Sequence, residues 1–211
     1  KKCEYVRVID YKSGSKSLDL DRAYYGLDLQ LFTYLNYIRK EFGKKRKDNL
    51  IIPSGAYYFH IDDPVVDFGG GEDAILKDLR FDGITLSGNH NIRLIDEAMV
   101  YNNTLTPQAD SDVIKLKTKK DGEPSSTTRL YVSGEMNELI DNSELEIEKS
   151  KKRILRGEIY PKPYSLGSEK GCDYCEYRGL CGFDLKMPGY NYNRLKKIDK
   201  KCFFEELRAG G

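Results

Sequence analysis

The sequence predicts an α/β domain, in which a mixed β-sheet is flanked by helices and followed by a cysteine-rich loop. Residues 6–14 contain a run of β-branched side chains that ends in the turn signal Ser13-Gly14, as is typical of a short buried strand. Residues 19–42 repeat apolar side chains at three- and four-residue steps, which predicts an amphipathic helix. Residues 55–61 are rich in aromatic side chains and predict a second strand.

A hairpin is predicted farther along the chain. The dipeptide Asp121-Gly122 separates the apolar runs 113–117 and 129–132, and this pattern favours two antiparallel strands joined by a tight turn. We expect them at an edge of the sheet. The remaining predicted elements are helices over 72–79 and 133–156 and a strand over 83–87.

Two regions are expected. A core domain covers residues 1–156, and a C-terminal extension covers residues 157–211. The boundary follows from Gly157, which ends the second long helix. Pro161 and Pro163 then keep the linker that follows this helix extended.

Bulk composition excludes several classes of protein. The net charge of the 211 residues is +1, so the charge of the whole chain does not indicate a nucleic-acid binder. No apolar run reaches the length of a membrane span. The odd number of cysteines, five, argues against a secreted disulfide framework and favours the cytoplasm. A Walker pattern is absent, so we do not expect this chain to hydrolyse ATP.

Asp10 and Lys12 end the first predicted strand and form the first candidate site. Side chains two residues apart on a strand point to the same face. There the carboxylate can hold a divalent cation, and the lysine can face an anion or a water molecule. A surface ion pair is the alternative. Gln30 and Tyr34 lie four residues apart on the predicted helix, and therefore one turn from each other on one face.

The two motifs together resemble the RecB-like branch of the PD-(D/E)XK nuclease superfamily. The matching residues are Ile9-Asp10-Tyr11-Lys12-Ser13, followed by Gln30-Leu31-Phe32-Thr33-Tyr34. The resemblance implies a restriction-endonuclease-like sheet flanked by helices. It also implies a metal-dependent reaction on the phosphodiester bonds of DNA.

Three cysteines with the spacing Cys-x2-Cys-x5-Cys form a second candidate site: Cys172, Cys175 and Cys181. Thiolates at these separations can bind one soft metal centre. Either a zinc site or an iron–sulfur cluster needs a fourth ligand from elsewhere. Three unligated cysteines in a tight loop remain the alternative.

A long helix, a proline-containing linker and this cysteine motif resemble the C-terminus of AddB (RexB) subunits of bacterial AddAB helicase–nucleases. That resemblance implies a structural 4Fe–4S cluster, whose fourth cysteine lies upstream of the nuclease motifs. It implies DNA and an AddA-type helicase subunit as partners. In that family the complex is ATP-dependent and processes double-strand DNA ends for recombinational repair, and this domain would be its deoxyribonuclease, an exonuclease.

The family pattern is incomplete here. Its upstream cysteine, and the Asp of its Gly-x-x-Asp-Arg-x-Asp strand, would precede Lys1. We therefore expect a fragment with little activity of its own. Cys3 and Cys202 are expected to be free cysteines.

The resemblance also implies roles for the first site. Asp10 and the missing Asp would bind Mg²⁺, with the backbone carbonyl of Tyr11 as a possible further ligand. Lys12 would orient the attacking water and stabilise charge on the phosphate. Gln30 and Tyr34 would position these groups.

Two other functions stay open. One is a zinc-stabilised nucleic-acid-binding module without catalysis, with Cys172, Cys175, Cys181 and Cys202 as zinc ligands. The other is an interaction domain that keeps the fold and has lost the chemistry.

Overall fold

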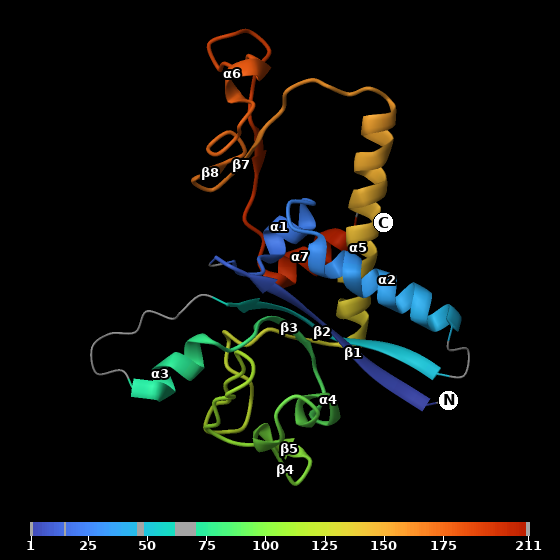
Figure 1. Cartoon of the computed structure of the whole chain (residues 1–211), viewed down its shortest axis with the longest axis vertical. Helices are drawn as coiled ribbons and strands as arrows, with labels where there is room; N and C mark the ends of the chain where they lie inside the picture. Colours follow the sequence, from blue (N-terminus) through green and yellow to red (C-terminus); the bar gives the residue numbers. More distant parts are fainter. Residues whose placement is uncertain (1, 15, 46–48, 62–70, 210–211) are drawn as a thin grey trace. The chain divides into compact units, whose positions relative to one another are not determined.

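The structure is a computed structural model, shown in Figure 1, and it describes residues 2–14, 16–45, 49–61 and 71–209. The chain packs into two compact units, which are described separately below. The first comprises Lys1–Asp19 and Asp28–Glu144, and the second comprises Leu20–Leu27 and Leu145–Gly211. The domain boundary expected after residue 156 lies at the end of a helix and not at the division between these two units, and it stays a prediction.

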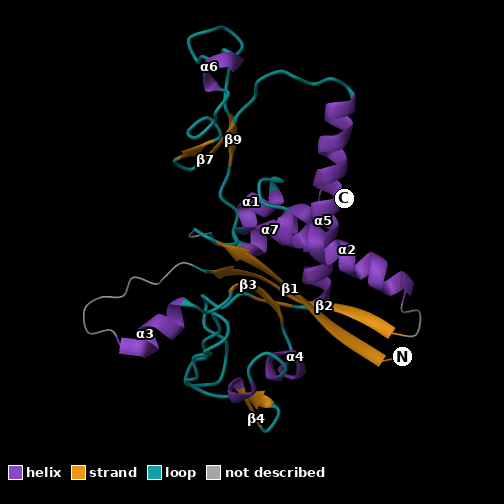
Figure 2. Ribbon diagram, viewed as in Figure 1, coloured by secondary structure: helices purple, strands orange, loops and turns teal. Residues whose placement is uncertain are grey.

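A four-stranded mixed sheet forms the centre of the first unit (Figure 2). Its order is β1-β2-β3-β6, and Figure 2 labels the first three of these strands. β1 pairs with β2 in parallel, β2 with β3 antiparallel, and β3 with β6 in parallel. The predicted α/β class with a mixed sheet is thereby confirmed. The strands are β1 (Lys2–Lys12), β2 (Asn49–His60), β3 (Asp82–Leu86) and β6 (Leu130–Tyr131).

The first two predicted strands are present and longer than expected. β1 and β2 run side by side along their full lengths, with a register shift between Val6 and Arg7. Val6 lies opposite Pro53 and Arg7 opposite Gly55, so Ser54 is an extra residue in β2. The Ser54 hydroxyl donates to the Val6 carbonyl over 3.2 Å and closes this bulge.

The prediction of one helix over 19–42 is wrong. The segment forms α1 (Leu20–Tyr24) and α2 (Gln30–Lys45), separated by a turn. Gly26 has φ +74°, a conformation that glycine adopts without strain. The Leu27 amide donates to the Arg22 carbonyl over 2.8 Å, which ends α1 at this turn. Apolar spacing continues across the break, so periodicity alone could not show it.

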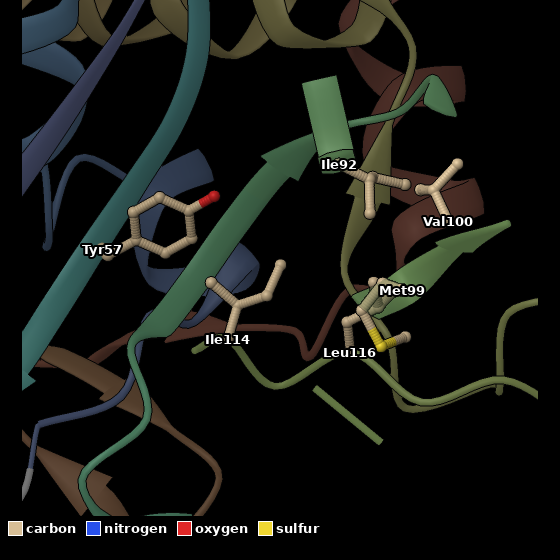
Figure 3. Packing of buried hydrophobic residues seen from close by; sticks show 6 residues of the cluster. All are labelled: Tyr57, Ile92, Met99, Val100, Ile114 and Leu116. Carbon is tan, nitrogen blue, oxygen red and sulfur yellow. The ribbon is translucent and has the colours of Figure 1, made fainter. Parts of the chain in front are cut away.

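Helix α2 covers one face of β1 and β2, against which it buries Leu31, Phe32 and Leu35. The opposite face of β2 carries a second cluster, shown in Figure 3. Its members come from β2, from α4 (Asn89–Arg93), from η1 (Glu97–Met99), from β4 (Val100–Tyr101) and from the loop after β5 (Thr104–Leu105). They are Tyr57, Ile92, Met99, Val100, Ile114 and Leu116. Burial raises the pKa of Tyr57 to about 12.

The predicted hairpin is wrong. Residues 113–117 form no strand in the part of the chain that the structure describes, and β6 pairs in parallel with β3 instead. Ile114 forms only an isolated parallel bridge with Phe81. The turn itself exists, since the Gly122 amide donates to the Lys119 carbonyl over 3.0 Å. Ile114 and Leu116 pack in the buried cluster around Tyr57 instead of pairing in a hairpin. Tertiary packing therefore overrides the local sequence pattern that favoured the hairpin.

Three more sequence predictions are confirmed, for α3 (Gly71–Asp78), β3 and α5 (Ser133–Leu155). Within the first unit α5 buries Met136, Leu139 and Ile140. It is tied to α2 by a pair between Arg39 and Asp141, whose nitrogen and oxygen lie 2.5 Å apart. None of the described helices combines the length and the apolarity that crossing a membrane requires.

The second unit is built on two helices and a small sheet. α1 packs against α7 (Lys200–Ala209), where the rings of Tyr24 and Phe203 lie 5.5 Å apart. Arg22 Nη1 donates to both carboxylate oxygens of Glu169, at 2.6 and 2.7 Å. These hydrogen bonds from Arg22, and to a smaller extent the one from Tyr164, lower the pKa of Glu169. The remaining elements are β7 (Tyr164–Leu166), β8 (Glu169–Lys170), α6 (Arg178–Cys181) and β9 (Asn193–Leu195).

Candidate functional site

Asp10 and Lys12 lie near the end of β1, the first strand in the order of the sheet. Both side chains project from one face, as the two-residue period of a strand requires. Lys12 Nζ lies 2.6 Å from Asp10 Oδ2, and the two side chains are 25% and 17% exposed. The pair is thus held close together and still reached by solvent.

Gln30 joins the pair to the helix. It is the first residue of α2, and its amide makes three hydrogen bonds. The Oε1 atom accepts from Lys12 Nζ over 2.9 Å. The Nε2 atom donates to Asp10 Oδ1 over 3.2 Å and to the Tyr34 hydroxyl over 3.0 Å. One amide therefore touches all three of the other side chains.

The structure thus brings together all four residues of the first candidate site. Tyr34 lies one turn beyond Gln30 on α2, and its side chain completes the group. Because the amide uses its oxygen toward an ammonium and its nitrogen toward a carboxylate, its orientation is determined by the charges that it faces. Such a network holds the charged atoms of Asp10 and Lys12 in one geometry.

The Tyr11 carbonyl is the remaining predicted ligand. The Lys12 carbonyl accepts from the Ile61 amide over 3.0 Å and therefore points toward β2. Successive carbonyls of a strand point in opposite directions, so that of Tyr11 points to the other edge of β1. No strand among the described residues pairs with that edge. Its role as a ligand stays a prediction.

The oxygen atoms of the Asp10 carboxylate and the Tyr11 carbonyl are of the type that a hard cation binds. A carboxylate and a carbonyl are oxygen ligands, which Mg²⁺ prefers. Their number is small, however: the described residues contain no group of three or more His, Cys, Asp or Glu side chains arranged for a metal ion. Asp10 is the one acid that the network of Gln30 includes.

The cysteines of the second candidate site are not gathered in the structure. All of them are free thiols; Cys172 is half-buried, whereas Cys175 and Cys181 are exposed. A turn joins the first two, with the Cys175 amide 3.5 Å from the Cys172 carbonyl, and Cys181 ends α6. Thiolates are ligands that a soft metal prefers, but among the described residues these three cysteines do not form a group that could hold a metal ion.

Cys3 and Cys202 lie outside this group. Cys3 is seven residues before Asp10 on the same strand, about 23 Å away at the rise of an extended chain. Cys202 is exposed on α7. The charge of Asp199, then desolvation and the hydrogen bond that the thiol donates to the Asp199 carboxylate, raise the pKa of this thiol. A raised pKa disfavours the thiolate that a metal needs.

Sequence reasoning missed three residues that border the first site: Lys16, Asp28 and Tyr58. Tyr58 is buried on β2, and its hydroxyl donates to Asp28 Oδ1 over 2.9 Å. The ring of Tyr58 lies 5.4 Å from Lys12 Nζ. The available signal was the acid Asp28 two residues before Gln30, but it falls inside the segment predicted as one continuous helix.

A strand that carries an acid and a lysine thus meets a helix that carries Gln and Tyr, which is the arrangement that the resemblance to PD-(D/E)XK nucleases implies. A family model described as the PD-(D/E)XK nuclease superfamily matches residues 1–182. The match covers most of the chain, and the protein belongs to this superfamily.

Three relatives resemble this chain over most of its own length. The chain is 33% identical over 199 residues to a protein of Lachnoclostridium phytofermentans, 35% over 207 residues to one of Clostridium kluyveri, and 32% over 211 residues to one of Bacillus cereus. Each is named as a subunit of an ATP-dependent helicase/deoxyribonuclease. The alignments cover 93%, 94% and 97% of this chain, but it spans about 17% of the length of these relatives.

Proposed function

We propose that this chain is the nuclease domain of a helicase–nuclease that degrades one DNA strand at double-strand ends for recombinational repair. The observation that carries this proposal is the Gln30 amide, which joins Asp10, Lys12 and Tyr34 into one network. A surface ion pair would need no such third partner. The names of the relatives, each a subunit of a helicase/deoxyribonuclease, support DNA as the substrate and a second subunit as the partner, which we propose to be an AddA-type helicase. A cytoplasmic location is part of the same proposal.

Asp10 would hold Mg²⁺ through its carboxylate, assisted by the Tyr11 carbonyl. When bound, this metal would polarise the scissile phosphate and acidify a water molecule. Lys12, whose ammonium is fixed by Asp10 and Gln30, would orient the attacking water and offset the charge that develops on the phosphate. Gln30 and Tyr34 would act as positioning residues, because Gln30 contacts Asp10 and Lys12 and Tyr34 contacts Gln30.

Gln30→Ala is expected to lower DNA cleavage by roughly 10- to 100-fold, the usual effect of removing a residue that orients a metal ligand. Tyr34→Phe should cost less, because the Gln30 amide keeps its bonds to Asp10 and Lys12. Single-turnover cleavage of a labelled single strand by a full-length subunit carrying this domain measures both effects. Equal activity of Gln30→Ala and wild type would show that the network is not needed.

The 211-residue chain alone should cleave slowly, because its network contains one acid. Robust Mg²⁺-dependent cleavage by this chain alone would contradict the view that a second carboxylate is missing. An inactive full-length subunit with normal unwinding would instead favour an interaction domain that has lost its chemistry.

For the cysteines we propose a structural 4Fe–4S cluster, with Cys172, Cys175 and Cys181 as three of its ligands. Their spacing supports it, and a fourth cysteine must come from outside this group. Iron and acid-labile sulfide, measured on the full-length protein purified without oxygen, should both be present at about four per chain. One zinc per chain without sulfide would favour the nucleic-acid-binding module instead.

A further inference from the structure

A second lysine lies beside the Asp10–Lys12 pair. Lys16 Nζ is 5.0 Å from the centroid of the Tyr58 ring, and Lys12 Nζ is 5.4 Å from the same centroid. The two ammonium groups are therefore at most about 10 Å apart. Phosphates along one DNA strand repeat about every 3.4 Å of helix axis, so the two lysines fall within reach of a few neighbouring phosphates.

A buried carboxylate fixes the position of this lysine. Asp28 Oδ1 lies 3.1 Å from Lys16 Nζ and also accepts the hydrogen bond of Tyr58. The Asp28 side chain is only 4% exposed, and its Oδ2 atom has no hydrogen-bond partner in the described parts of the chain. Burying a carboxylate is costly, and a buried ion pair is weak evidence for stability. What the arrangement achieves is to hold one ammonium group over Tyr58.

Lys16 keeps donors available. Its side chain is 39% exposed, and an ammonium group has three N–H donors, of which Asp28 accepts one. Lys12, by contrast, is engaged by both Asp10 and Gln30. Lys16 can therefore donate to an anion in solvent without leaving Asp28.

We propose that Lys16 binds a phosphate next to the scissile one on a single DNA strand, with Asp28 as its positioning residue. The inference rests on the proposed nuclease function and adds to it a contact outside the Asp-x-Lys and Gln-x-x-x-Tyr motifs. It places the incoming strand along the side of the site where the exposed Lys16 lies. A phosphate held there fixes the register of the next phosphate over Asp10 and Lys12.

The test is the salt dependence of binding between the 211-residue chain and a fluorescent single-stranded oligonucleotide, measured with Ca²⁺ in place of Mg²⁺ to prevent cleavage. One lost phosphate contact reduces the slope of log K against log salt by about 0.7, and it weakens binding roughly fivefold at 0.1 M salt. Lys16→Ala should show both changes, and Lys16→Arg should restore the wild-type slope.

Lys44→Ala is the matched control. Lys44 is also an exposed lysine paired with an acid, Glu41, but it lies fourteen residues along α2 from Gln30, about 21 Å away. The slope of log K against log salt for Lys44→Ala should equal that of wild type. For Asp28, the variant Asp28→Asn keeps an acceptor for Tyr58 and removes the charge that holds Lys16. It should weaken binding, and the double variant with Lys16→Ala should bind no worse than Lys16→Ala alone.

A wild-type slope in Lys16→Ala, at an unchanged melting temperature, would overturn the proposal and leave the Lys16–Asp28 pair a structural contact. An equal loss of slope in Lys44→Ala, or no oligonucleotide binding by wild type, would overturn it as well. Failure of the nuclease proposal looks different. In that case Lys16→Ala still shows the shallower slope of log K against log salt. The full-length subunit, however, either cleaves no DNA with metal present or cleaves it equally well with Lys12→Ala.

Discussion

Lys12→Ala is expected to lower DNA cleavage by about 10²- to 10³-fold in a full-length subunit carrying this domain, the usual cost of removing a donor that stabilises transition-state charge. Asp10→Asn should lower it at least as far. Among the described residues, no neighbouring contact of these two side chains would replace the charge that either substitution removes. Gln30 lies in contact with both side chains, but it offers an amide and not a charge.

Unwinding and ATP hydrolysis should be unchanged in both variants, because the chain contains no Walker pattern. Two variants serve as matched controls in the first unit. Asp141→Asn removes an exposed acid from the contact between α2 and α5, and Lys44→Ala removes an exposed lysine. Both should cleave like wild type. Normal strand degradation by Lys12→Ala would refute the assignment of the site.

Gly83→Ala is expected to unfold the first unit or to destabilise it by more than about 4 kcal/mol, an effect at the extreme of single substitutions. Gly83 lies on β3 directly opposite Tyr57 of β2. A Cβ atom added there would lie 1.9 Å from the Ala56 carbonyl oxygen and 2.8 Å from the Tyr57 Cα atom. Both neighbours are backbone atoms, so the strands must separate to admit the methyl group.

Urea unfolding followed by circular dichroism measures this effect. Gly134→Ala is the control, since Gly134 is the second residue of α5 and a Cβ atom there meets nothing within 4 Å. Alanine is favoured over glycine in helices by about 1 kcal/mol, so this variant should be as stable as wild type or slightly more stable. A change of less than about 1 kcal/mol in Gly83→Ala would mean that β2 and β3 are not paired as described.

The four residues of the first site could be predicted because each spacing is a local property of one element. Asp10 and Lys12 share a face whenever residues 9–12 are extended, and Gln30 and Tyr34 share a face whenever residues 30–34 are helical. That the two faces meet was an inference from the family resemblance. The structure supplies the contact that joins them, the Gln30 amide.

Other features depend on contacts that no local pattern contains. The break at Gly26 needs a positive φ in the middle of a continuing apolar repeat. The hairpin failed because Ile114 and Leu116 gain more by joining the cluster around Tyr57 than by pairing across Asp121-Gly122. The Lys16–Asp28–Tyr58 contacts combine a loop, a helix entry and a strand, and only the folded sheet brings them together.

Titration of the isotope-labelled chain with Mn²⁺, followed by NMR, tests most directly whether Asp10, Lys12, Gln30 and Tyr34 form one metal-dependent site. Paramagnetic broadening should appear first at the backbone amides of Asp10, Tyr11 and Lys12 and at the side-chain amide of Gln30, and Asp10→Asn should abolish it. If these signals stay sharp while others broaden, or if Asp10→Asn broadens like wild type, the metal does not bind at this site and the proposed mechanism is wrong.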